Sequence, residues 1–206
     1  MASNSELDQR LKILAVTKVF TRPKALTLGD NQYPANIFSL WSSSELEAIG
    51  IYEVVIDNTN LKNQEYYINT NQSFAFADGT VTASYGTATA KNLDNTLYTA
   101  DDETANSEHV EGTVASYGLK HNHKATINSQ AAGQLQPTDW MILRAADGGT
   151  AVPSSITTKR AAVRTKANTM CTAIDDAADV DALIALYVYN DATPPVRPLG
   201  ELPEVG

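Results

Sequence analysis

The hydrophobic and polar positions of this chain change their period along its length. Ile13 to Phe20 is dense in β-branched and apolar residues, Thr21-Arg22-Pro23-Lys24 interrupts the run, and Ala25 to Leu28 resumes it. Short apolar runs on either side of a proline-containing turn are typical of paired strands. The start of the chain therefore predicts a β-hairpin.

A short helix is predicted after this hairpin. Ser42 stands three residues before Glu45, the spacing at which each side chain can cap the backbone N–H of the other residue. We expect the helix to run through Leu46 and to end at Gly50, because glycine readily adopts the left-handed conformation of a C-terminal cap. Ile51 to Ile56 then follows as a predicted buried strand.

The middle of the chain predicts a second hairpin. Aromatic and apolar residues recur at even intervals between Gln64 and Ala77, and Asp78-Gly79 follows them. This dipeptide favours a tight turn, because both central residues of that turn need positive φ. Thr80 to Tyr85 is expected to return as the antiparallel partner.

Two further features of the middle are open to more than one interpretation. Gly79 to Gly86 is nearly repeated as Gly112 to Gly118, which indicates either two equivalent strands, lying side by side or paired with equivalent partners, or a chance match of simple composition. Between the two copies, Asp101 to Glu108 is predicted to be a solvated acidic loop.

The last third of the chain has helical spacing, first over Lys124 to Gln134 and then over Ile156 to Ile174. In the second segment the apolar stripe consists of Ile156, Val163, Ala167, Met170 and Ile174, while Lys159, Arg160, Lys166 and Asn168 are expected to lie largely elsewhere. Asp179 can cap a following helix over Val180 to Tyr187, whose Leu183 and Tyr187 would fold back on the first and form a helical hairpin.

These elements predict an α+β fold in four segments. The segments are a β-rich head (11–56), a Thr/Asn/Ser-rich β insert (57–120), a helical module (121–189) and an extended proline-rich tail (190–206). Small side chains bury little apolar area against the backbone entropy that folding costs. We therefore expect neighbouring proteins to order the insert and the tail.

Charge and composition narrow the functional classes. The net charge of −9 argues against a surface that neutralises phosphates, so nucleic acid is not an expected partner. No apolar run is long enough for a membrane span, and the first residues lack the basic and apolar regions of a secretion signal. We expect a chain made in the cytoplasm, with no membrane partner.

Candidate chemical groups all have simpler structural explanations. His121 and His123 would share one face of a strand, with only His109 to join them, so no metal site is predicted. Asp101, Asp102 and Glu103 lack the spacing of a calcium loop, and the acidic residues from Asp175 to Asp181 lie where helices are capped. Cys171, the only cysteine, is expected to be a small buried hydrophobe. With no catalytic motif present, we predict a non-enzymatic protein without cofactors.

Several short motifs resemble a known class of proteins. They are Leu135-Gln136-Pro137-Thr138-Asp139-Trp140, Arg144, Pro153 and Arg160-Ala161-Ala162-Val163-Arg164, with Tyr33-Pro34, Trp41, Glu45 and Ile49-Gly50-Ile51 nearer the start. This pattern is similar to small bacteriophage tail-fibre-region proteins, including tail-fibre assembly proteins, of the marine or cyanobacterial phage type. The motifs touch both ends of the chain and are short, so they indicate a broad class.

The resemblance implies a structural protein of the phage tail, from the tail-fibre or baseplate region, located in the virion. Its partners would be other tail, fibre or baseplate proteins, or further copies of itself. The alternatives are a transient tail-fibre assembly chaperone and, lower, a carbohydrate-binding receptor module.

Large aromatics and prolines are the predicted contact residues. Trp140 would either pack on the helical stripe or contact a partner, since large aromatics serve both cores and interfaces. The full set of expected interaction residues is Trp41, Tyr66, Phe74, Phe76, Tyr85, Tyr117, Trp140, Pro194, Pro195 and Pro198.

Overall fold

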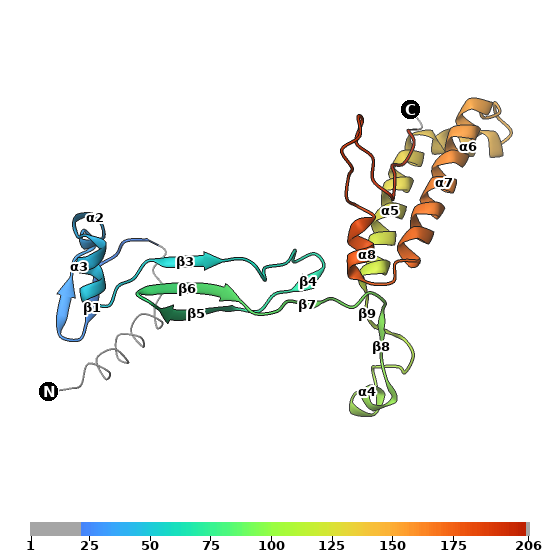
Figure 1. Cartoon of the computed structure of the whole chain (residues 1–206). Coiled ribbons are helices and arrows are strands. Elements are labelled where there is room, and N and C mark those ends of the chain that lie inside the picture. The colour runs from blue at the N-terminus through green and yellow to red at the C-terminus, as the bar shows by residue number, and fades with distance from the viewer. Residues whose placement is uncertain (1–21, 205–206) are drawn as a thin grey trace. The chain divides into compact units, whose positions relative to one another are not determined.

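A computed structural model describes residues 22–204 and contains both strands and helices, which confirms the α+β class (Figure 1). The chain divides into two compact units between Thr89 and Ala90. This boundary falls inside the predicted insert (57–120), so the four predicted segments do not match the two units. The predicted strand over 13–20 lies outside the described residues.

The described part of the first unit starts with a small hairpin and two short helices. Strand β1 (Leu26–Leu28) pairs antiparallel with β2 (Asn31–Tyr33) across a turn in which Gly29 has a φ of +59°. Among the described residues, β2 is thus the partner of the predicted strand at 25–28. Helices α2 (Ile37–Leu40) and α3 (Ser43–Ala48) follow.

The predicted caps of α3 are confirmed. Ser42 Oγ accepts a hydrogen bond from the Glu45 backbone N–H, and the Glu45 carboxylate accepts one from the Ser42 N–H at 2.8 Å. These hydrogen bonds from Ser42 lower the pKa of Glu45. Gly50 follows the helix with a φ of +83°, as its position in the sequence predicts.

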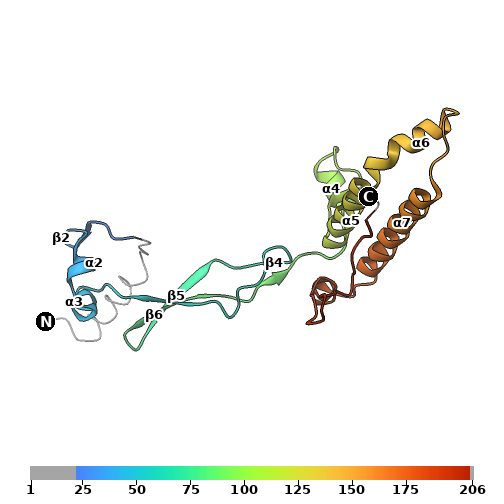
Figure 2. The ribbon, with the colours of Figure 1, turned by 90° about the horizontal axis from the view of Figure 1, so that it is seen from above.

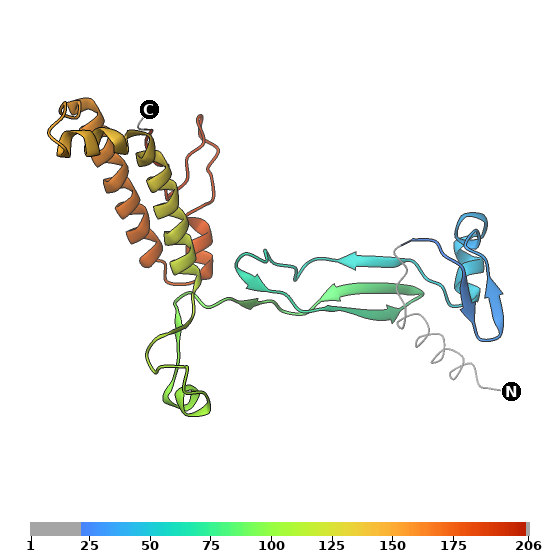
Figure 3. The same cartoon turned by 180° about the vertical axis from the view of Figure 1, so that it is seen from behind.

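A three-stranded sheet forms the rest of the first unit, in the order β3 (Val54–Asp57), β6 (Thr80–Tyr85), β5 (Gln72–Ala77) (Figure 3). The antiparallel β5–β6 hairpin is confirmed, with positive φ at both Asp78 and Gly79. Strand β3 runs parallel to β6, which places the predicted last strand of the head in the sheet of the insert. Strand β4 (Tyr67–Ile68) pairs separately with β7 (Thr89–Ala90).

The second unit starts with a two-stranded sheet and a short helix. Strands β8 (Thr96–Leu97) and β9 (Val114–Ser116) pair antiparallel and flank helix α4 (Ala100–Ala105). The prediction of a loop over 101–108 is therefore wrong for its first half. Thr99 and Asp102 cap each other's backbone N–H groups, and a short acidic segment with such a capping box can form a helical turn.

The near-repeat does not produce equivalent strands. The first copy gives β6, which pairs with β3 and β5, and the second gives β9, which pairs with β8. The glycines that end the two copies, Gly86 and Gly118, also differ in their surroundings. A Cβ at Gly118 would overlap the backbone of Asp94, whereas a Cβ at Gly86 would meet only the Thr70 side chain. The repeat is thus a similarity of composition.

Five helical segments complete the second unit: α5 (Leu119–Leu135), the 3-10 turn η1 (Gln136–Thr138), α6 (Asp139–Ala146), α7 (Ser154–Asp175) and α8 (Val180–Ala185). The long helices α5 and α7 lie side by side (Figures 1 and 2). Val163, Ala167, Met170 and Ile174 of α7 are buried, which confirms most of the predicted stripe, while Ile156 is half-buried.

Helix α8 contributes a further side to the core of this unit. Asp179 Oδ1 accepts a hydrogen bond from the Ala182 N–H at 2.7 Å, which confirms the predicted cap. Leu183 is fully buried, and Leu119, Ile127 and Ala131 of α5 face the same core. The main helical pair is therefore α5 with α7, whereas the sequence predicted α7 with α8.

The proline-rich tail was predicted to be extended, but it folds back on the helical unit. The Asn190 N–H donates to Val196 O, and the Leu199 N–H donates to Leu186 O at 3.0 Å, so the tail turns back toward α8. Leu199 is 2% exposed, and Lys166 Nζ donates to its carbonyl. The buried leucine supplies the apolar anchor that the prolines alone could not provide.

Glu201 is expected to make the return of the tail dependent on pH. The hydrogen bond from Tyr189 Oη at 2.6 Å, helped by Arg197, lowers the pKa of Glu201 despite its partial burial. Its stabilising contribution is therefore complete above the ordinary glutamate pKa of about 4.3 and is lost as the pH falls through the lowered value. We expect acid to release the tail before the helices unfold, visible as NMR shift changes at Leu199 and Gly200.

A matched pair of variants checks this expectation. Glu201→Gln should remove the acid-dependent shifts at Leu199, because the titrating group is gone, while Glu204→Gln, an exposed glutamate three residues on, should preserve them. Equal titration of Leu199 in the parent and in Glu201→Gln would contradict the assignment.

Candidate interaction surfaces

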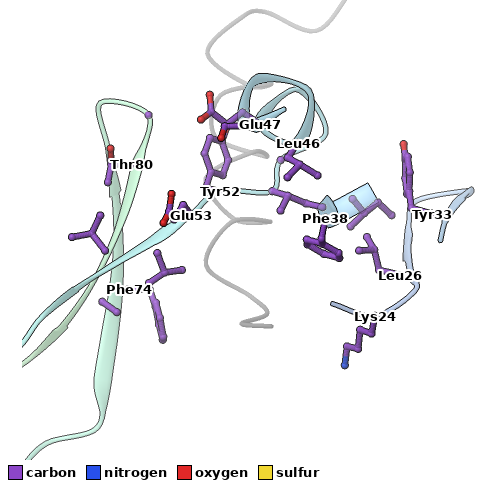
Figure 4. A pocket seen from close by; sticks show the side chains of 18 of the residues that line it. Lys24, Leu26, Tyr33, Phe38, Leu46, Glu47, Tyr52, Glu53, Phe74 and Thr80 are labelled. Atoms are coloured by element: carbon purple, nitrogen blue, oxygen red, sulfur yellow. The ribbon is translucent and has the colours of Figure 1, made fainter. Parts of the chain in front are cut away.

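In the first unit, a groove of about 1730 Å³ lies between the β1–β2, α2 and α3 segments and the three-stranded sheet. One wall carries Leu26, Phe38 and Leu46, and the other carries Phe74 and its neighbours on the sheet (Figure 4). Two acidic side chains, Glu47 and Glu53, lie at the same groove. Lys24 lines it too, so the lining combines apolar side chains with polar ones and with charges of both signs.

Strand register explains why this face of the sheet is apolar. Val54 lies opposite Val81 and Ile56 opposite Ala83, and the partners of Val81 and Ala83 on β5 are Phe76 and Phe74. All of these side chains share one face, because alternate residues of a strand point to opposite sides. Ala75 and Thr82 belong to the other face.

The apolar face is only partly covered. Val81 and Ala83 on the central strand are buried, while Phe74 and Phe76 are half-buried and Ile56 is 62% exposed. Tyr52 contacts Phe76 with ring centroids 4.6 Å apart, which covers one corner. A sheet face of this composition buries more apolar area when something lies across it.

In the second unit, two of the motifs that carry the resemblance, 135–140 and 160–164, meet at one buried cation. Arg160 Nη1 donates to Leu135 O at 2.7 Å and to Thr138 Oγ1 at 2.5 Å, and Nη2 pairs with Asp139 Oδ1 at 2.7 Å. The Arg160 side chain therefore ties the end of α5 and the start of α6 to the middle of α7.

This cluster corrects one prediction. Arg160 was expected away from the apolar stripe of α7, but it is 4% exposed and lies in line with it. At the start of α6, Thr138 and Asp139 both bind Arg160, and α6 has no side-chain cap. The helix is held at its start by a guanidinium instead of by a cap.

Helix α6 presents large apolar side chains at the surface. Trp140 is 53% exposed, with the Arg144 guanidinium 4.8 Å from the centre of its ring, and Leu143 is 70% exposed. Trp140 is thus not enclosed by the α7 stripe. Since Trp140 and Leu143 are three residues apart on a helix, they lie on neighbouring positions of one surface.

The structure divides the ten predicted interaction residues between the units. In the first unit Tyr66 is buried, while Trp41, Phe74, Phe76 and Tyr85 are half-buried. Of these, Phe74 lines the groove, and Trp41 packs edge-on against Tyr33, which also lines it. In the second unit the exposed residues are Tyr117, Trp140, Pro194, Pro195 and Pro198.

Each histidine makes a separate aromatic contact. His109 stacks on Tyr98, His121 stacks on Tyr117, and His123 hydrogen-bonds the Tyr187 hydroxyl at 2.8 Å. Because His121 and His123 lie in α5 and not in a strand, two-residue spacing does not give them a shared face. In the described part of the chain, no group of three or more His, Cys, Asp or Glu is placed to hold a metal ion.

The thiol and the acidic residues near α7 have structural roles. Partial burial raises the pKa of Cys171, whose Sγ lies 3.8 Å from Asn128 Oδ1. Asp175 pairs with Lys124 at 2.6 Å and links α7 to α5, while Asp179 caps α8. These contacts agree with the structural interpretation of the residues.

Comparisons with known proteins found no match to the chain among protein families, curated proteins or solved structures. Within residues 22–204, no helix is both long and apolar enough to cross a membrane.

Proposed function

We propose that this chain is a non-enzymatic structural protein of a bacteriophage tail, from the tail-fibre or baseplate region. It acts through contacts with other tail proteins, or with copies of itself, in the virion. The observation that carries the proposal is the Arg160 cluster. Residues of two motifs that resemble phage tail proteins, 135–140 and 160–164, hold the start of α6 in place there.

The cluster supports a docking role for α6. A guanidinium with three partners fixes the start of the helix, and this leaves Trp140 and Leu143 in a defined position at the surface. Pre-positioned side chains lose little entropy on binding, and tryptophan is enriched at interface hot spots.

The distribution of apolar residues agrees with a protein that functions as part of a larger assembly. Among the described residues, exposed large hydrophobic side chains are about as numerous as buried apolar ones, and they include Ile56, Ile68, Leu143 and Val188. Extensive exposed apolar surface marks interaction sites on soluble proteins. The candidate chemical groups described above make structural contacts, so we assign the chain no catalytic role.

Quantitative mass spectrometry of purified virus particles tests the proposal. We expect the chain in the particles at a fixed ratio to the major tail proteins. An assembly chaperone would be present in infected cells and absent from particles, which would overturn the structural role.

Paired variants make the test specific to α6. Trp140→Ala with Leu143→Ser should reduce incorporation into particles without changing the helical circular dichroism, because both side chains are largely exposed. Thr169→Ala, an exposed change on α7, should leave incorporation unchanged. Normal incorporation of the α6 double variant would exclude this surface.

A further inference from the structure

Strand β5 is an outer strand of the three-stranded sheet in the first unit (Figure 3). It pairs with β6 along one edge, and among residues 22–204 no strand pairs with its other edge. Such an edge presents a row of backbone N–H and C=O groups to which another strand can add. Proteins usually prevent this addition with a lysine, a proline or a β-bulge in the edge strand.

Strand β5 has none of these protective features. Its residues, Gln72–Ala77, include no charge and no proline, and its register with β6 runs without a shift. On the face away from the groove its side chains are small and exposed, namely those of Ser73, Ala75 and Ala77. A second strand can therefore add to β5 without a clash of charge or volume.

The opposite edge of the sheet is less suited to pairing with a copy of itself. Strand β3 ends at Asp57 and follows Glu53. If two β3 strands paired antiparallel about Val55, each Glu53 would lie opposite the Asp57 of the other copy. Like charges directly opposite each other destabilise a strand pair. The two edges thus differ, and β5 is the one that tolerates an identical partner.

The turn after β5 determines which of its backbone groups face outward. Asp78 and Gly79, both with positive φ, form a two-residue turn between Ala77 and Thr80. Residues that flank such a turn exchange hydrogen bonds, and hydrogen-bonded positions then alternate along the ladder. The N–H and C=O groups of Phe74 and Phe76 therefore point to the outer edge.

Two copies of β5 are complementary in an antiparallel register centred on Ala75. Phe74 of each copy then lies opposite Phe76 of the other, so the outward backbone groups of both residues meet partners. Aromatic residues opposite each other on one face stabilise a strand pair, and both rings are only half-buried in the single chain. On the other face, Ala75 meets Ala75 and Ser73 meets Ala77.

From this complementarity we propose that two copies of the chain pair through β5 about a two-fold axis at Ala75. The pairing joins two three-stranded sheets into one, with β3 at each outer edge. It also makes the apolar faces of the two sheets continuous. The interface is isologous, as in most homodimers. The inference does not depend on the proposed function, because the sheet of the first unit alone carries it.

Light scattering after gel filtration of the full chain tests the pairing. The parent should have twice the mass of the 206-residue chain. Ala75→Lys should have the mass of one chain, because two ammonium groups would lie opposite each other at the axis. Val55→Lys is the matched control: it adds the same charge at an exposed position of the other edge strand and should leave the dimer intact.

Circular dichroism should be the same in both lysine variants and the parent, since both positions are exposed. A parent with the mass of one chain would overturn the proposal and leave the β5 edge open for a different protein. A dimer that survives Ala75→Lys would overturn it as well, because the two copies would then meet at another surface.

Cysteine crosslinking tests the register independently. In a Cys171→Ser background, Ala75→Cys should form a disulfide between two copies on mild oxidation, because the introduced thiols face each other across the axis. Val55→Cys, on the same face at the other edge, should stay largely uncrosslinked. Equal crosslinking at the two positions, or none at Ala75→Cys, would contradict pairing through β5.

Discussion

Replacing Met170 with aspartate should lower the free energy of unfolding of the helical unit by about 4 kcal/mol or more. Met170 is 1% exposed between α5 and α7, so the variant loses its packing and buries an uncompensated carboxylate. Urea denaturation followed by circular dichroism at the helical minimum measures the change, because α5 and α7 are the two longest helices of residues 22–204.

The neighbouring residue supplies the control for this prediction. Thr169→Asp introduces the same charge one position earlier on the exposed face of α7, and we expect a change within about 0.5 kcal/mol. If Met170→Asp unfolds at the same urea concentration as the parent, the stripe does not form the core of this unit.

Arg160→Ala should cost about 2–4 kcal/mol of unfolding free energy. The substitution leaves Leu135 O and Thr138 Oγ1 without their buried donor and removes the ion pair with Asp139. Since Asp139 is more than half exposed, most of the cost comes from the two buried partners. Loss of the guanidinium should also release the start of α6 and shift the fluorescence of Trp140.

A second arginine on α7 separates the loss of contacts from the loss of charge. Arg164→Ala removes the same charge from an exposed position one turn later, and its effect should stay within about 0.5 kcal/mol. Arg160→Lys should recover only part of the stability, because one ammonium does not reproduce the two-pronged guanidinium geometry. Equal destabilisation by Arg160→Ala and Arg164→Ala would show that Arg160 acts only through its charge.

Local signals in the sequence predicted local structure well. The Ser42–Glu45 capping box, the Asp78-Gly79 turn and the Asp179 cap are all confirmed. Each depends on residues a few positions apart, and the physical requirement is the same in any fold. The stripe of α7 was predictable for a similar reason, since helical periodicity is a property of the segment itself.

Structure that depends on distant residues was predicted poorly. The parallel pairing of β3 with β6 joins segments on either side of the β5 strand, and nothing within β3 specifies that partner. Helix α5 begins at Leu119, five residues before the segment in which helical spacing was recognised (124–134), because the first turn of the helix carries polar residues and histidines that show no apolar period. The return of the tail depends on Leu199, a single apolar residue among polar and proline neighbours.

Of the two candidate surfaces, one could not be predicted from the sequence and the other could have been. The groove was not predictable, because its walls come from residues as far apart along the chain as Lys24 and Ala83. Arg160 could have been found, since it fills the seven-residue gap between Ile156 and Val163 in the α7 stripe. Its charge led us to place it elsewhere, although a buried arginine is expected wherever several acceptors converge.

The parallel pairing of β3 and β6 gives the first unit a particular response to mechanical force. The chain enters the sheet at the amino end of β3 and leaves it at the carboxyl end of β6. A pull on the two ends of the unit would draw these strands in opposite directions along their length, in shear. The evenly spaced hydrogen bonds of a parallel ladder then share the load at the same time instead of breaking one after another. The β3–β6 ladder is therefore the element that sets the tension at which this unit would yield.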